Sequence, residues 1–159
     1  ACLLYYFYAA DLRQMLALAL VFSLLLVISI ADYLYLMIPD RFQFLLLLSV
    51  VFRQFALPVA DWPSAFISFL VVFSLLFFTG LALPGGIGGG DVKLLSILSI
   101  TFGLEPTLFI ILLASFSAGS YFLHSHLTKA SSLQRRLPFG PFLSAAAVLV
   151  HFAQVLLIR

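Results

Sequence analysis

Two aspartates stand in contexts where a carboxylate is unusual, and together they could carry out acid–base chemistry. Asp32 follows about twenty nearly unbroken apolar or small residues and precedes six that are almost all apolar. An ionisable residue inside a membrane span costs roughly 2.5–3.5 kcal/mol on insertion scales, so one kept there is a candidate for function. Taken alone, Asp32 could equally be a helix-end residue that reaches the lipid headgroups.

Asp91 ends a glycine-rich segment, residues 85–90, that has five glycines in six positions. Glycine permits backbone conformations and close approaches that other residues do not. Asp91 stands where this loop meets the next apolar segment, so it could cap that helix, and the helix dipole would stabilise a carboxylate there. Lys93 could pair with Asp91 or with lipid phosphate. The alternative is a flexible loop with an N-cap aspartate and no chemistry.

Two carboxylates that lie close together favour hydrolysis by acid–base catalysis. Repulsion prevents both from ionising, so one of them keeps a proton. The ionised carboxylate takes a proton from water, and the protonated one donates to the carbonyl oxygen of a peptide bond. This chemistry needs no metal or cofactor. Because Asp32 and Asp91 are 59 positions apart, only tertiary packing can bring them together.

The composition predicts an all-α, polytopic bundle of transmembrane helices. Hydrophobic residues make up 64% of the chain and charged residues 9%, with a mean hydropathy of +1.22. A soluble domain is usually about one quarter charged. We expect one membrane-embedded domain over residues 1–159 with lipid around it. The net charge of +2 and the lack of a basic stripe argue against a nucleic-acid partner. The single cysteine excludes a four-cysteine zinc site.

Six apolar runs, separated by short polar segments, are candidates for crossing the membrane. They are Leu12–Ile38, Phe42–Leu57, Ala65–Leu83, Val92–Leu104, Thr107–Leu123 and a last run after Pro141 that reaches Ile158. A crossing needs about 20 apolar residues, so the fourth run predicts a half-helix or a tilted segment.

The basic residues of the loops indicate the orientation. If the fourth run crosses, one side holds Arg41, Lys93, Lys129, Arg135 and Arg136, and the other holds Arg13, Arg53 and Arg159. The richer side is expected to be cytoplasmic. Asp32, Asp40 and Asp91 then lie on that side.

Three motifs resemble those of the prepilin peptidase family, which contains intramembrane aspartyl proteases. Asp32 stands six residues before an Ile-Pro-Asp sequence at residues 38–40, as in the first catalytic motif of that family. Residues 88–94, Gly-Gly-Gly-Asp-Val-Lys-Leu, resemble its Gly-x-Gly-Asp-x-Lys-Leu motif. Residues 138–141, Pro-Phe-Gly-Pro, are similar to a segment near its C-terminus. The three occur in the order of the family and span most of the chain.

The resemblance implies an enzyme of the bacterial or archaeal cytoplasmic membrane. Such enzymes cut a short basic leader from pilins, Flp pilins or pseudopilins, and the hydrophobic helix of the substrate stays in the bilayer. Asp32 and Asp91 would be the catalytic pair. The supporting residues implied by the motifs are Pro39, Asp40, Gly88, Gly90, Lys93, Pro138, Gly140 and Pro141.

Larger members of the family also carry a four-cysteine region and N-methylate the new terminus. The single cysteine, Cys2, therefore predicts peptidase activity alone. One alternative is a small proton- or cation-coupled transporter component, in which Asp32 and Asp91 relay ions beside a broken helix. Another is a structural membrane subunit without chemistry. The combination of the three motifs favours the peptidase.

Overall fold

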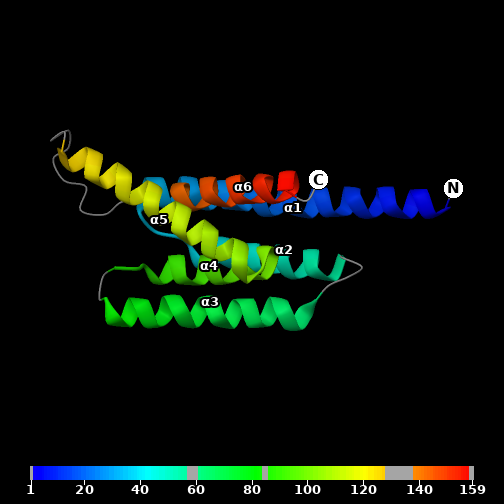
Figure 1. The fold of residues 1–159 in the computed structure, drawn as a ribbon, viewed down its shortest axis with the longest axis horizontal. Coiled ribbons are helices and arrows are strands. Elements are labelled where there is room, and N and C mark those ends of the chain that lie inside the picture. The colour runs from blue at the N-terminus through cyan, green and yellow to red at the C-terminus, as the bar shows by residue number, and fades with distance from the viewer. Residues whose placement is uncertain (1, 57–60, 84–85, 128–137, 158–159) are drawn as a thin grey trace.

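The computed structural model describes residues 2–56, 61–83, 86–127 and 138–157, and these ranges form helices and short connections without a strand (Figure 1). The helices are α1 (Cys2–Tyr35), α2 (Asp40–Ala56), α3 (Trp62–Ala82), α4 (Gly89–Phe102), α5 (Leu104–Leu127) and α6 (Gly140–Leu157). The prediction of an all-α bundle with about six segments is confirmed.

Three of these helices contain a stretch long and apolar enough to cross a membrane. The stretches are Met15–Tyr35 of α1, the whole of α3 and the whole of α5, with mean hydropathies of 2.5, 2.4 and 1.7. Their outward faces carry large apolar side chains, among them Phe78 and Phe116, which are 66% and 72% exposed. Lipid tails solvate such a surface far better than water does, so the chain is an integral membrane protein.

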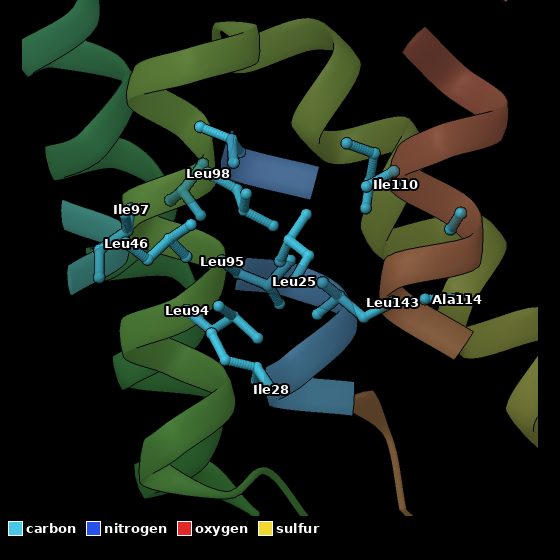
Figure 2. Packing of buried hydrophobic residues seen from close by; sticks show 14 of the residues in the cluster. Leu25, Ile28, Leu46, Leu94, Leu95, Ile97, Leu98, Ile110, Ala114 and Leu143 are labelled. Carbon is cyan, nitrogen blue, oxygen red and sulfur yellow. The ribbon is translucent and has the colours of Figure 1, made fainter. Parts of the chain in front are cut away.

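The short helix α4 lies at the centre of the bundle. It packs against α2, α3 and α5, while α1 packs against α2 and α6, and α5 against α6. Leu94, Leu95 and Leu98 of α4 are fully buried against Leu25 and Ile28 of α1 (Figure 2). With 14 residues α4 is as short as predicted. Its neighbours, rather than lipid, therefore bury most of its surface.

The first helix, α1, differs from the prediction at both of its ends. α1 begins at Cys2, not at Leu12, and ends at Tyr35, three residues before Ile38. Leu36 adopts the left-handed conformation, with φ of 51°, and its N–H donates to the Asp32 carbonyl at 2.8 Å. A left-handed residue is a common helix terminator, and the residue before a proline avoids helical geometry. The chain therefore turns before Pro39.

Two further helices include residues that the prediction placed in loops. α4 begins at Gly89, so Gly90 is helical, and α6 begins at Gly140, so Pro141 stands in its first turn. Proline is tolerated there because the first N–H groups of a helix need no partner within it. α5 also begins earlier than Thr107, at Leu104, directly after Gly103 with φ of 84°. That conformation, which favours glycine, turns α4 into α5 without a longer loop.

Candidate functional site

Asp32 lies near the end of α1, beside the first residue of α6. Its side chain is 7% exposed, and its Oδ2 atom accepts a hydrogen bond of 2.7 Å from the N–H of Gly140. A Cβ atom on Gly140 would lie 3.0 Å from both Cβ and Oδ2 of Asp32. The close approach therefore requires glycine. The N–H groups and dipole at the start of a helix favour a negative charge at this position.

Two serines hold the start of α6 against α1. Ser29 donates to the Gly140 carbonyl at 3.1 Å, and the hydroxyls of Ser29 and Ser144 are hydrogen-bonded to each other. Ser144 also contacts the Gly140 carbonyl at 2.9 Å. These bonds fix the direction of the Gly140 N–H that reaches Asp32. The sequence prediction missed both serines, although Ser29 stands one turn before Asp32 and so shares its helix face.

Asp91 lies in the first turn of α4 rather than at the cap. The residue at the N-cap is Gly88, whose carbonyl accepts the Asp91 N–H at 3.0 Å, and no side chain caps this helix. The prediction that Asp91 caps the helix is therefore wrong. A Cβ atom on Gly88 would lie 3.0 Å from Oδ2 of Asp91, so the carboxylate folds over the preceding turn.

The structure brings Asp91 and Asp32 to the same end of the bundle. α4, with 14 residues, is not one of the candidate membrane spans, and Asp91 stands at its edge. Burial is the main cause that raises the pKa of Asp91 to about 6, and the nearby charge of Asp32 is the second. The backbone hydrogen bond at Gly88 acts in the opposite direction and lowers the pKa. The two carboxylates are thus close enough to interact electrostatically. Such a pair can hold one proton between its members at acidic to neutral pH.

Lys93 pairs with Asp40 and not with Asp91. Its Nζ atom lies 2.9 Å from Oδ1 of Asp40, and both side chains are exposed. The ion pair links the first residue of α2 to the fifth residue of α4. Exposed pairs contribute about 0–1 kcal/mol, so the pair adds little to stability. Lys93 and Asp40 therefore mark a polar rim beside the buried Asp32 and the half-buried Asp91.

Gln43 connects α2 directly to the residue before Asp91. Its side chain is 3% exposed, and Nε2 donates to the Gly90 carbonyl at 3.0 Å. A Cβ atom on Gly90 would lie 3.2 Å from Cβ of Ile38, so this glycine also permits a close approach. The sequence prediction missed Gln43. The signal was present, because Gln43 is a polar residue one turn after Pro39 in an otherwise apolar run.

The prolines of the motifs lie at the starts of helices. The Pro39 carbonyl accepts N–H groups of Phe42 and Gln43 at 3.1 and 3.4 Å, which opens α2. Pro138 is buried just before α6, and Pro141 stands in its first turn. Each motif thus begins a helix next to one of the two carboxylates.

Comparisons with known proteins show the family to which the chain belongs. Residues 19–123 match a family described as the type IV leader peptidase family. The chain is 26% identical to the prepilin leader peptidase/N-methyltransferase of Bacillus subtilis (strain 168) over 156 residues, which cover 95% of this chain and 62% of that protein. It is 35% identical to the leader peptidase HopD of Escherichia coli over 127 residues, 76% of this chain and 81% of that protein.

Neither the Bacillus match nor the family match covers both proteins in full. The chain spans less than two thirds of the Bacillus relative. The family match includes Asp32 and Asp91 but ends before Pro138. No solved structure matches the chain.

Proposed function

Because the chain belongs to the type IV leader peptidase family, we propose that it is an intramembrane aspartyl endopeptidase acting on prepilin-like proteins. The observation that carries the proposal is the placement of Asp32 and Asp91 at one end of the bundle, where burial, and next the charge of Asp32, raise the pKa of Asp91. A structural subunit would have no need of a buried carboxyl beside a half-buried one, because desolvation of carboxylates is costly.

In the proposed mechanism Asp32 is the general base and Asp91 the general acid. Asp32, held by the Gly140 N–H, removes a proton from water as the water oxygen attacks the carbonyl carbon of the scissile peptide bond. Asp91 donates its proton to the carbonyl oxygen. The tetrahedral intermediate then collapses and its carbon–nitrogen bond breaks. The proton on Asp32 passes to the leaving amine, and one hydroxyl of the intermediate returns its proton to Asp91 as the carboxyl group forms. The products are a carboxyl terminus and a new amino terminus.

The site suits a substrate that is half in the membrane. The exposed ion pair of Asp40 and Lys93 faces water at this end, while the faces of α3 and α5 are apolar. A basic leader can stay in water while the apolar helix that follows it remains in lipid. We assign the pilin, Flp pilin or pseudopilin class as substrate and the cytoplasmic membrane of a bacterium or archaeon as location, with several crossings. The proposal covers peptidase activity and not N-methylation.

The proposal is tested by co-expressing the chain with a prepilin-like protein and following the size of that substrate. Asp32→Asn and Asp91→Asn should each abolish cleavage while the protein stays in the membrane. Asp61→Asn is the matched control, because Asp61 caps α3 through its side chain at the opposite end of the bundle. Cleavage that survives either catalytic substitution would refute the pair. Ion flux in liposomes that requires the same two aspartates would favour the transporter.

A further inference from the structure

An open slot of about 530 Å³ lies between α2 and α3, and α4 forms its floor. Both helices pack against α4 rather than closely against each other. The walls are apolar, with Phe44 and Leu47 from α2, Phe66 and Phe69 from α3, and Ile97 from α4. Phe44 and Phe66 stand at the rim, 65% and 63% exposed. The slot thus has a floor and two walls, and its open side lacks a partner.

The two ends of the slot differ. At the far end the rings of Phe55 and Trp62 lie 4.8 Å apart and join the end of α2 to the start of α3. At the other end the lining is polar and consists of Asp40, Lys93 and Gln43. Gln43 donates to the Gly90 carbonyl, next to Asp91. The slot therefore leads along the bundle to the candidate site.

Gln43 has an unused hydrogen-bonding atom. Its Oε1 is buried and accepts no hydrogen bond from the residues that the structure describes. A buried acceptor without a partner is costly, so a ligand with an N–H donor at this position would be bound more favourably. A peptide has such donors. The first N–H groups of a helix have no partner within it, and they lie at the end where the leader of a prepilin-like substrate would join its apolar helix.

We propose that the slot between α2 and α3 receives the apolar helix of the substrate, with Gln43 accepting a hydrogen bond from its N-terminal turn. The proposal rests on the proposed function, which supplies the class of substrate. The substrate helix covers the rim residues Phe44 and Phe66 and completes the side of the bundle that α2 and α3 leave open. The peptide bond before that helix then lies beside Asp91. A lipid acyl chain would match the walls but offers Gln43 no donor.

Disulfide cross-linking tests the position of the substrate. In a Cys2→Ser, Asp91→Asn background, Phe66→Cys is paired with a prepilin-like protein that carries single cysteines along its apolar helix. Phe109→Cys is the matched control, because Phe109 is 58% exposed, stands as early in α5 as Phe66 does in α3, and lines a second groove of about 500 Å³. Adducts should form at Phe66→Cys, on one face of the substrate helix. No adduct there, or equal adducts at Phe109→Cys, would overturn the proposal.

Kinetics separate this proposal from the proposed function. Phe66→Ala should raise KM for the full-length substrate about tenfold with kcat unchanged, whereas Phe109→Ala should leave KM unchanged. A peptide that spans the cleavage site but lacks the apolar helix should be cut equally by the wild type and by Phe66→Ala. If the wild type cuts the full-length substrate and Phe66→Ala has the same KM, the slot is refuted and the peptidase stands. If the wild type cuts neither substrate, the proposed function itself fails.

Discussion

The two ends of the bundle hold buried charge in different ways. At one end the carboxylate of Asp32 is held at 2.7 Å by the backbone N–H of Gly140, and Asp91 lies in the next helix start. At the other end the guanidinium of Arg53 donates to the carbonyl of Thr101 at 3.1 Å, and its Nε atom has no partner among the described residues. One end is organised to carry two interacting acids, and the other to hold a single cation.

The glycines at the candidate site differ from one elsewhere in the bundle in how closely their backbone approaches neighbouring side chains. A Cβ atom would meet Asp32 at 3.0 Å if placed on Gly140, and Ile38 at 3.2 Å if placed on Gly90. A Cβ atom on Gly119, in the middle of α5, would meet nothing within 4 Å. At the far end, by contrast, side chains fill the space, with the rings of Phe22 and Phe102 6.2 Å apart. Close backbone approach is therefore a property of the candidate site and not of the bundle as a whole.

Among substitutions that test this difference between the two ends, Gly140→Ala is expected to lower kcat/KM the most. The added methyl group displaces the N–H from Asp32, and a hydrogen bond to a charged group is worth roughly 1.5–3 kcal/mol, so kcat/KM should fall about 10- to 100-fold. Cleavage of the co-expressed substrate measures the loss. Gly119→Ala is the same substitution in open space and should retain activity. Equal activity of the two variants would show that the approach to Asp32 has no role in catalysis.

The pH dependence of cleavage should report the protonation of Asp91. Asp91, with a pKa raised to about 6, is the acid, so kcat/KM should fall about tenfold for each unit of pH above 6. Stability should change in the same direction. The folded state binds this proton more tightly than the unfolded state, so the free energy of unfolding should fall as the pH rises from 3.8 to about 6. Asp91→Asn should remove that slope, and an unchanged slope would assign it to another group.

A smaller effect is expected from Gln43→Leu, which removes the hydrogen bond to the Gly90 carbonyl. A neutral hydrogen bond contributes about 0.5–1.5 kcal/mol, so kcat/KM should fall roughly 2- to 10-fold. Gln54→Leu is the matched control, because Gln54 is also buried in α2 but lies at the far end. Its cleavage rate should match that of the wild type. Equal losses in the two variants would indicate general destabilisation of α2.

The smallest effect is expected from Asp40→Asn, which breaks the exposed ion pair with Lys93. Such pairs are worth about 0–1 kcal/mol, so kcat/KM should change less than about fivefold, and less still at high salt. A loss as large as that of Gly140→Ala would mean that Asp40 touches the substrate and does more than connect two helix starts.

The sequence was sufficient for the helices but not for their ends. Apolar runs predict helices, and all six are present, three of them with a stretch long and apolar enough to cross a membrane. Hydropathy does not measure where a helix stops, however, so residues 2–11 of α1 were missed. Gly90 and Pro141 were also placed outside helices, because a helix start tolerates both residue types and the pattern cannot show whether the first turn forms there.

For the site, the sequence identified residues but not their partners. Asp32 and Asp91 stand out because carboxylates are rare in apolar segments. The Gln43 bond to Gly90 and the Ser29 bond to Ser144 join residues 47 and 115 positions apart. Only the packing of α2 on α4 and of α1 on α6 creates these contacts. For the same reason, the ion pair of Lys93 with Asp40 was not among the partners considered, since Asp40 comes within reach only once α2 and α4 are side by side.

The brevity of α4 has a consequence for how the protein is made. At 14 residues it is too short to enter the bilayer on its own as a chain emerges from the insertion machinery. It turns into α5 at Gly103 with no intervening loop, so the two are expected to enter together as a hairpin. The N–H of Gly140 then reaches Asp32 only once α6, which follows α5 in the chain, has docked. A chain made only as far as α5 would therefore lack the hydrogen bond that holds the Asp32 carboxylate.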